Sequence, residues 1–441
     1  MKILFSNPPW WETQPDGSIR QGIRAGSRWP FTKHCQHEPG KFKFGGYLPF
    51  PFFLAHSAAH TKMLMPDAKI EIRDSIARGE AYESFWNYLH DEFTPDFLVV
   101  ESATSSLEHD LSLIAHTSLT FKAILTGPID CDKHVEIFEK HPNVHAIVQG
   151  EYDKQIAVAI NAPRGTVLAH NLLTREEMAA SPLPMWDEAC ATNYWDPCPR
   201  GQRAPHIQLW ASRGCPFRCC FCSWPAVMTG NDPDGTKPRS VRFYPPEYVE
   251  RHIIERMKLH KYESVYFDDD TFNLNEKHTL EICAVMKKIG LPWSAMCRAD
   301  TISRDAWREM RRSGCFGVKI GFESGSQYVI DHIVNKKLDL KEAAAITRFL
   351  KSIGMTVHGT FTMGLPGETP EMRKETAAFI KSLPLDTHQL SGTGEISGTP
   401  LDTIRKKGSL AKYDGAVMSP DYKVMSDGQR KIEEMAQPPI S

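Results

Sequence analysis

The chain lacks a long apolar run, and its first residues, Met-Lys-Ile-Leu-Phe-Ser-Asn, carry no leader-cleavage pattern. These absences predict no signal peptide and no membrane-spanning helix, and they favour a cytoplasmic protein. The chain also lacks a basic block, since 52 Lys and Arg residues stand against 54 Asp and Glu residues and give a formal charge of −2. We therefore expect neither nucleic acid nor an anionic membrane as a partner.

Cysteine is better represented. The 11 cysteines are odd in number and scattered, apart from one group. This usage favours a reducing compartment and a metal site over a disulfide framework. With 441 residues, of which 41% are hydrophobic and 24% charged, the chain should form two or three domains.

The cysteine group lies in a stretch that reads Ser-Arg-Gly-Cys-Pro-Phe-Arg-Cys-Cys-Phe-Cys-Ser-Trp from Ser212. Cys215, Cys219 and Cys222 form a Cys-x3-Cys-x2-Cys array, and the Gly and Pro beside the first cysteine favour a loop that turns three sulfurs toward one point. A structural zinc site prefers four ligands, whereas a four-iron cluster held by three cysteines leaves one iron free for a co-substrate. The array predicts such a cluster; a zinc site completed by a distant His or Cys is the alternative.

This loop resembles the signature of the radical S-adenosylmethionine (SAM) enzymes, including an aromatic residue, Phe221, just before the third cysteine. The resemblance implies a [4Fe-4S] cluster on the three cysteines, SAM bound to its open iron, and Phe221 packed near the adenine. An electron passed into SAM would give a 5′-deoxyadenosyl radical, which implies an electron donor such as flavodoxin or ferredoxin. Cys220 should be a buried thiol beside the cluster.

The N-terminal part alternates short apolar runs with stretches of helical length. The runs lie at 2–6, 69–73, 97–101, 122–126 and 144–148. This alternation predicts a doubly wound parallel sheet over residues 1–161, with ligands beyond the carboxyl ends of its strands. No Gly-x-Gly-x-x-Gly follows the first run, which argues against an ordinary dinucleotide-binding fold. Residues 12–46 show no clear period and are expected to form a long loop.

Four segments ahead of the cysteine loop resemble the cobalamin-binding domain of one branch of the radical SAM enzymes. They read Asn-Pro-Pro-Trp, Pro-Asp-Phe-Leu-Val-Val-Glu-Ser, Ile-Leu-Thr-Gly-Pro and Val-Gln-Gly-Glu, in this order. The resemblance implies a Rossmann-like domain whose strand-end loops contact cobalamin through Pro9, Trp10, Ser102, Thr104, Ser105, Gly127, Gly150 and Glu151.

Two departures from the cobalamin pattern stand out. The Asp-x-His-x-x-Gly motif that supplies a cobalt-ligating histidine in other cobalamin proteins is absent, and Gly127-Pro128 replaces the Gly-Gly of the family. A domain that has lost cobalamin is therefore the alternative. Trp10 could equally cap the sheet as a packed aromatic.

Residues 162–204 are rich in proline and interrupt the alternation, which predicts a linker. From 205 to about 400, six apolar runs alternate with five helical patterns, which resembles the partial (β/α)6 barrel of radical SAM enzymes. The cysteine loop follows the first of these runs. It should therefore lie at a strand's carboxyl end, where α/β barrels place their chemistry. Residues 401–441 are expected to form a short C-terminal extension.

Polar residues follow later barrel runs. Glu323 begins Glu-Ser-Gly-Ser, which resembles the SAM contact of the family. Glu323 can accept hydrogen bonds from both ribose hydroxyls, while Ser324 and Ser326 open a helix whose free N–H groups can receive a carboxylate. A helix cap with a solvated Glu is the alternative.

Asp269 and Asp270 lie in a segment similar to the Asp-Asp-x-Phe of cobalamin-type members and are expected near the SAM ammonium. The aspartate triplet that begins at Asp268 could equally be a divalent-metal site or an N-cap. Arg298 could pair with a carboxylate of SAM or of substrate, or form a structural salt bridge to Asp300 or to the triplet.

The predicted function is that of a cobalamin-dependent radical SAM enzyme that methylates an unactivated carbon of a small-molecule or carrier-attached substrate. The enzymatic alternative is ring formation, rearrangement or epimerisation without methyl transfer. The non-enzymatic alternative is a protein that senses cobalamin or metal. No residue is assigned to catalysis itself.

Overall fold

The computed structural model describes residues 1–13, 17, 19–23, 31–36, 47–115, 121–230, 241–393 and 396–402. The chain divides into two units, Met1–Asp196 with Ser223–Pro233, and Pro197–Cys222 with the chain from Asp234 onward. The expected C-terminal extension lies outside the described residues beyond Asp402.

A parallel sheet of six strands forms the first unit, in the order β5-β1-β6-β7-β8-β9. Five of the strands arise from the predicted apolar runs, which read as continuous because both faces of the sheet are buried. Strand β1 lies between β5 and β6, where the strand order reverses, and this confirms the doubly wound fold. The strands are β1 (Lys2–Asn7), β5 (Lys69–Asp74), β6 (Phe97–Glu101), β7 (Lys122–Thr126), β8 (Val144–Val148) and β9 (Thr166–Leu168).

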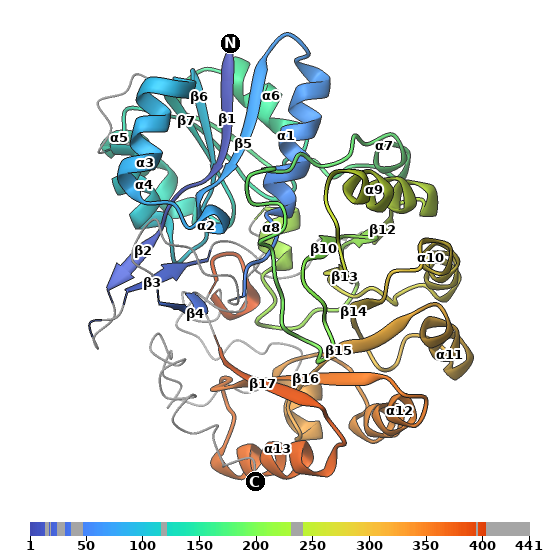
Figure 1. Cartoon of the computed structure of the whole chain (residues 1–441). Coiled ribbons are helices and arrows are strands. Elements are labelled where there is room, and N and C mark those ends of the chain that lie inside the picture. Colours follow the sequence, from blue (N-terminus) through green and yellow to red (C-terminus); the bar gives the residue numbers. More distant parts are fainter. Residues whose placement is uncertain are drawn as a thin grey trace. The chain divides into compact units, whose positions relative to one another are not determined.

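Helices cover both faces of this sheet. Helices α1 and α6 lie on one face, and α3, α4 and α5 lie on the other (Figure 1), where one apolar cluster includes Leu98, Leu111 and Ile137. The helical elements are α1 (Phe52–Leu64), α2 (Ser75–Arg78), α3 (Tyr82–Asn87), the π-helix η1 (Tyr88–Phe93), α4 (Leu107–Ala115), the 3-10 helix η2 (Cys131–Lys133), α5 (His134–Lys140), α6 (Gln155–Asn161), α7 (Arg175–Ala179) and α8 (Trp224–Thr229).

Part of the expected long loop 12–46 is a small antiparallel sheet, so the expectation of a plain loop is wrong there. Its strands are β2 (Trp11–Thr13), β3 (Ile19–Gly22) and β4 (Phe31–Gln36). These strands contain no continuous apolar run of strand length, so the sequence does not indicate them.

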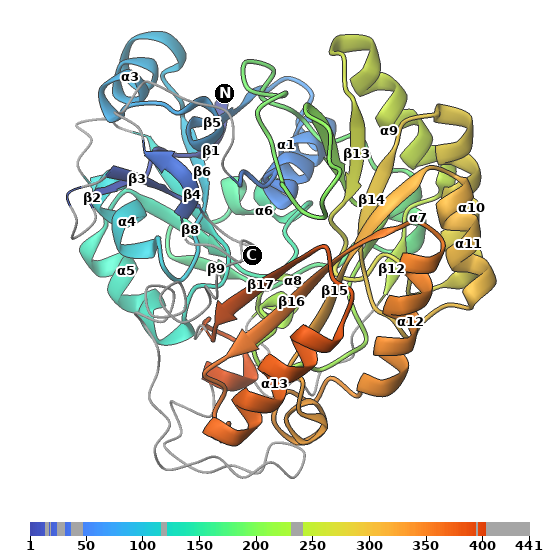
Figure 2. The same ribbon diagram turned by 60° about the horizontal axis from the view of Figure 1, so that its bottom comes forward.

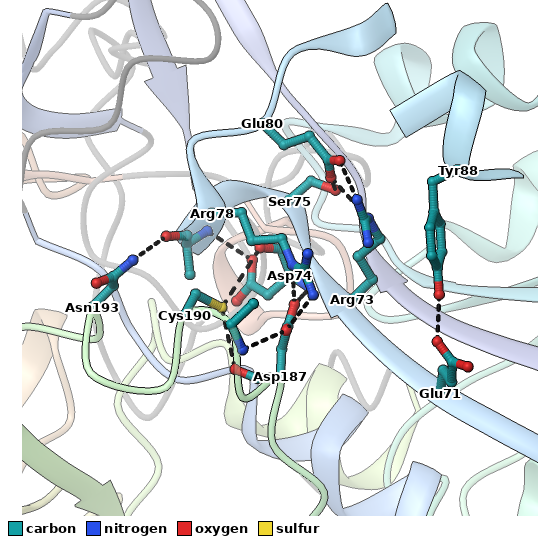
Figure 3. A network of polar contacts seen from close by, with 12 residues as sticks. Glu71, Arg73, Asp74, Ser75, Arg78, Glu80, Tyr88, Asp187, Cys190 and Asn193 are labelled. Atoms are coloured by element: carbon teal, nitrogen blue, oxygen red, sulfur yellow. Dashed lines mark hydrogen bonds and ion pairs between the residues drawn. The ribbon is translucent and has the colours of Figure 1, made fainter. Parts of the chain in front are cut away.

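Part of the expected linker packs on the first unit (Figure 3). Arg78 of α2 donates two hydrogen bonds to Asp187 at 2.5 and 2.6 Å. The Tyr194 hydroxyl donates to Asp74 at 3.1 Å. The Asn193 amide donates to the carbonyl oxygen of Ala77 at 3.0 Å. These bonds attach the segment to the carboxyl end of β5.

The second unit is a parallel sheet of six strands in the order β10-β13-β14-β15-β16-β17. Its helices lie on the outer side of the curved sheet (Figure 2). The elements are β10 (His206–Leu209), β11 (Ser212–Arg213), β12 (Arg242–Phe243), α9 (Pro246–Leu259), β13 (Ser264–Phe267), α10 (Glu276–Ile289), β14 (Trp293–Cys297), α11 (Arg304–Arg312), β15 (Cys315–Glu323), the π-helix η3 (Val329–Ile333), α12 (Leu340–Ser352), β16 (Thr356–Met363), α13 (Pro370–Ser382) and β17 (Thr387–Gly392).

Local signals explain these helices. Helix α10 begins where the Asn275 side chain accepts from the N–H of His278, ends at Gly290 with φ 80°, and buries Ile282 and Met286. Helix α12 begins at the capping side chain of Asp339 in the same way. The six strands and five helices confirm the expected partial barrel. Within the described part of the chain, no helix is both long and apolar enough to cross a membrane.

Candidate active site

The cysteine loop begins just beyond the carboxyl end of β10. Strand β11, which pairs with β12, leads into it, and Gly214 then turns the chain with φ 93°, a conformation that favours glycine. The N–H of Gly214 donates to Oδ2 of Asp270 at 2.9 Å. The start of the loop is therefore fixed to the end of β13.

The four cysteines of the loop differ in burial. Cys220 is only 2% exposed and packs with Val334 and Leu365, whereas Cys215, Cys219 and Cys222 are half-buried. The N–H of Cys220 donates to the carbonyl oxygen of Val334 at 2.9 Å. Cys220 is thus the buried thiol that the sequence predicts.

The three half-buried cysteines suit an iron–sulfur cluster, because thiolates are the usual ligands of such clusters and all three cysteines are partly accessible. Burial raises the pKa of Cys215 to about 11. The N–H of Cys222 donates to the carbonyl oxygen of Cys219 at 3.1 Å, which brings these two residues into one turn. Among the residues that the structure describes, no group of three or more His, Cys, Asp and Glu side chains is arranged to hold a metal ion. The cluster assignment stays a prediction.

Asp269 and Asp270 bind the backbone of the cysteine loop. Asp269 accepts from the N–H of Ala211 at 3.2 Å and from the Ser212 hydroxyl at 2.5 Å. Burial raises the pKa of Asp269 to about 7 and raises the pKa of Asp270 well above its usual range. In this structure the two carboxylates position the loop, and their contact with SAM stays a prediction.

Arg298 forms the salt bridge to Asp300 that was one of the alternatives drawn from the sequence. It donates to both oxygens of Asp300, at 2.9 and 2.7 Å, and is 4% exposed. Its guanidinium lies 3.5 Å from the centre of the Phe217 ring, a cation–π contact with the cysteine loop. It therefore supports the loop.

Glu323 ends β15 in an unusual conformation. Its φ is 66°, which is rare for a residue with a Cβ and is retained only where surrounding contacts hold it. Oε1 accepts from Nζ of Lys336 at 2.9 Å, and Oε2 accepts from the Thr362 hydroxyl at 2.9 Å. A Cβ at Gly321 would come within 2.4 Å of Oε1 and 2.8 Å of Nζ of Lys336, so a larger residue there would have to displace this pair. Glu323 is buried and paired, not solvated.

The Ser-Gly-Ser that follows is tied to α13. The hydroxyls of Ser324 and Thr376 lie 2.9 Å apart, and the N–H of Ser326 donates to Oγ of Ser324 at 3.1 Å. Both serines are buried. Phe221 of the cysteine loop packs against the apolar cluster that contains Val329 of η3. Their contacts with SAM stay predictions.

The site predicted from the sequence omits three residues that contact Glu323 or Ser324 in the structure. Lys336, Thr362 and Thr376 lie 13 to 52 residues from the groups they contact. The need of a buried carboxylate for a cation could have indicated a lysine. Nothing in the sequence singles out Lys336 among its neighbours.

In the first unit, the strand order reverses between β1 and β6, which is where ligands of such sheets bind. Pro9 follows β1 and Ser102 follows β6, so both lie at this point. Ser102 is buried and donates to Asp110 at 2.9 Å, whereas Thr104 and Ser105 are exposed. The small and hydroxyl-bearing residues here suit a polar ligand tail.

Beside this point, Gly127 has φ 104°, and a Cβ on it would lie 2.1 Å from the carbonyl oxygen of Ser102. Glycine there lets the β6 and β7 loops approach closely. Trp10 is 2% exposed and packs with Leu48 and Ile76, which agrees with the packed-aromatic interpretation.

Gly150 and Glu151 hold neighbouring backbone. Glu151 is fully buried, accepts from the N–H of Leu173 at 2.6 Å and donates its own N–H to Met228 at 3.0 Å. A Cβ on Gly150 would lie 2.4 Å from Cβ of His170. The cobalamin contacts of these residues and of the others named from the sequence stay predictions.

Comparison with known proteins agrees with this arrangement. Residues 211–380 match the Radical SAM superfamily. An uncharacterised methyltransferase of Pyrococcus horikoshii is 26% identical over 378 residues, which cover 80% of this chain and 77% of that protein. The anaerobic magnesium-protoporphyrin IX monomethyl ester cyclase of Rubrivivax gelatinosus is 24% identical, over 85% of this chain and 65% of the cyclase.

Among solved structures, the chain resembles the radical SAM methyltransferase TsrM from Kitasatospora setae with cobalamin and a [4Fe-4S] cluster bound. The TM-score is 0.60 at 13% identity, over 81% of this chain and 72% of TsrM. The chain thus contains a radical SAM domain at residues 211–380 and shares the fold of the TsrM structure.

Proposed function

We propose that this protein is a cobalamin-dependent radical SAM enzyme that transfers a methyl group to an unactivated carbon of a small-molecule or carrier-attached substrate. The observation that carries the proposal is the cysteine loop at the carboxyl end of β10. It turns Cys220 into the core and leaves Cys215, Cys219 and Cys222 half-exposed.

Each cofactor has a candidate set of residues. Cys215, Cys219 and Cys222 would hold a [4Fe-4S] cluster, which when bound supplies the electron that cleaves SAM. The loops after β1 and β6 would hold cobalamin, through residues such as Pro9 and Ser102. An electron donor such as flavodoxin or ferredoxin would be required.

The remaining residues position these groups. Asp269 and Asp270 fix the entry of the cysteine loop through its backbone N–H groups. The carboxylate of Glu323 is held by Lys336 and Thr362, and it would receive the ribose hydroxyls of SAM by exchanging the Thr362 hydrogen bond. Burial of this pair keeps water away from the carboxylate.

A second candidate is radical ring formation without methyl transfer. It is favoured by the cyclase of Rubrivivax gelatinosus, whose likeness extends over 85% of this chain. The two candidates share the residues above. They differ only in whether the product gains one CH2.

The test begins with anaerobic reconstitution followed by iron, sulfide and cobalt analysis. We expect the protein to bind iron, sulfide and cobalamin, and to form 5′-deoxyadenosine from SAM and dithionite. Cys219→Ala should lose iron, sulfide and this activity, whereas Cys220→Ala should keep them. Absence of labile sulfide from the native protein would refute the proposal.

SAM with a trideuterated methyl group then separates the two reactions. Methylation predicts deuterium in the product isolated from a cell extract, and ring formation predicts none. If the protein takes up iron and sulfide but forms no 5′-deoxyadenosine from SAM, the result would favour the non-enzymatic alternative, a protein that binds the cofactors without catalysis.

A further inference from the structure

His109 lies at the point of the first sheet where the strand order reverses. It belongs to the first turn of α4, which follows the loop after β6. Its ring stacks on Trp10 of the loop after β1, with 5.9 Å between the ring centres and 27° between the ring planes. His109 therefore contacts both of the loops that would hold cobalamin under the proposed function. The site predicted from the sequence does not include it.

One ring nitrogen of His109 faces a carboxylate. Nδ1 lies 3.3 Å from Oδ1 of Asp110, which is fully buried. The hydroxyls of Ser102 and Ser106 donate to Oδ2 of Asp110 at 2.9 and 2.8 Å. A carboxylate only accepts hydrogen bonds, so Nδ1 of His109 carries the hydrogen and donates it to Asp110.

The other ring nitrogen, Nε2, therefore has a lone pair in the neutral imidazole. It lies 2.8 Å from the hydroxyl of Tyr82, which also accepts from the N–H of Trp11 at 3.0 Å. The Tyr82 hydroxyl thus donates its own hydrogen to Nε2. The side chain of His109 is 24% exposed, so a ligand can reach it.

A histidine in this tautomer is suited to bind a metal. Histidines that bind metals almost always donate their other ring N–H to a carboxylate, a carbonyl oxygen or water, which fixes the ring and raises its basicity. Asp110 provides such a carboxylate for His109. The Asp-x-His-x-x-Gly motif of other cobalamin proteins is absent from this chain, so His109 would reach the cobalt from a different element of the sheet.

We propose that His109 binds the cobalt of cobalamin through Nε2, with Asp110 as the residue that positions its ring. This inference rests on the cobalamin-binding part of the proposed function. Nε2 exchanges the hydrogen bond from Tyr82 for a bond to cobalt, while Nδ1 keeps its hydrogen, so no proton is transferred. His109 takes the coordination position that the dimethylbenzimidazole base occupies in free cobalamin.

The test uses the full-length protein with nitrogen-15 in its histidines, loaded with cob(II)alamin and measured by electron paramagnetic resonance. A nitrogen-15 ligand splits each cobalt line into a doublet, whereas the nitrogen-14 of dimethylbenzimidazole splits it into a triplet. We expect doublets from the labelled protein and triplets from the unlabelled protein. Triplets from both samples would show that the cofactor's own base is bound, and unsplit lines would show that no nitrogen is bound; either result would overturn the proposal.

His109→Gln identifies which histidine is the ligand, and glutamine keeps a polar side chain beside Tyr82 and Asp110. We expect this variant to lose the doublet. His90→Gln is the matched control, because His90 is an exposed histidine of the same unit in η1, and it should keep the doublet. A doublet that persists in His109→Gln would assign the ligand to another histidine.

Tyr82→Phe gives a second and independent measurement. It removes the hydroxyl that competes for Nε2, so the affinity for cob(II)alamin should rise about threefold in an absorbance titration. A histidine that only packed on Trp10 would give no such gain. An affinity that does not rise would count against a bond through Nε2.

The same samples separate this inference from the proposed function. If the native protein binds no cobalamin, both are refuted. If the doublet appears but no methyl group is transferred from SAM, His109 is the cobalt ligand and only the proposed methyl transfer is refuted.

Discussion

At the scale of single residues, Glu323 is the buried and strained residue at the carboxyl end of β15. Its carboxylate is buried between Lys336 and Thr362, and its backbone adopts a φ of 66°. A non-glycine residue in this region costs on the order of 1–3 kcal/mol, which neighbouring contacts must offset. Such local strain at a strand end is typical of a residue held ready for a ligand.

Replacing Lys336 with Met should destabilise the protein by about 3 kcal/mol, because the buried carboxylate of Glu323 would lose its cation. Urea unfolding at pH 7 measures this change. Lys337→Met is the control, since the Lys337 side chain is exposed on the same segment. Equal stability of the two variants would show that the ion pair contributes little.

Asp74 should make stability depend on pH. Burial raises its pKa to about 6 from an ordinary 3.8. Since the folded state then binds the proton more tightly than the unfolded state, the contribution of Asp74 to stability decreases as the pH rises from about 4 through 6.

Asp74→Asn should therefore flatten the curve of stability against pH over this interval. An asparagine can still accept from the N–H of Ala77, which caps α2 (Figure 3). Urea midpoints measured from pH 4 to 7 give the comparison with the native protein. Parallel curves would contradict the assigned pKa.

At the scale of elements, the cysteine loop depends on the end of β13 for its shape. Both oxygens of Asp269 accept from the N–H of Ala211, so Asp269→Asn would place an amide donor against that N–H group and cost about 2 kcal/mol locally. We expect the reconstituted variant to hold less iron and sulfide than the native protein. Asp305→Asn is the control, because Asp305 is exposed and pairs with Arg308 on α11. Full loading of the Asp269 variant would contradict a positioning role.

Most elements could be predicted because their signals are local. The strand at residues 144–148 reads as an apolar run, and the helix at 276–289 has an Asn cap and a terminal Gly. Strand β9 and the small sheet of β2 to β4 could not be predicted, because none of these strands contains a continuous apolar run of strand length. The cysteine spacing was equally local.

The partners of the site residues could not be predicted. Glu323 and Thr362 are 39 residues apart, and Ser324 and Thr376 are 52 apart. Only the parallel pairing of β15 with β16 and the return of α13 bring them together. The motif that contains Asp269 indicates an acid near the site, and the fold adds its contacts with Ala211 and Ser212, which the sequence does not show.

At the scale of the whole molecule, the first unit does not end at residue 161, where the regular alternation stops. Asp187 accepts from Arg78 of α2, and the Tyr194 hydroxyl donates to Asp74 at the end of β5. The N–H of Leu173 donates to Glu151. We expect a fragment of residues 1–196 to be more stable than one of residues 1–161 by at least about 3 kcal/mol, because the shorter fragment leaves Arg78 without Asp187.

Urea unfolding followed by circular dichroism measures this difference. Both fragments lack Met228, whose carbonyl oxygen accepts from Glu151, so that loss is matched. Equal midpoints would place the folding boundary at 161.

The described residues 223–230 belong with the first unit, whereas Cys222 belongs with the second. A gene shuffled at a single junction between the two units would therefore separate Gly150 and Glu151 from the peptide that packs on them. Recombination that joins the N-terminal unit to another barrel must therefore also transfer the segment that begins at Ser223, directly after the third cysteine of the array. Such lineages should inherit both parts together, so their evolutionary trees should have the same branching order.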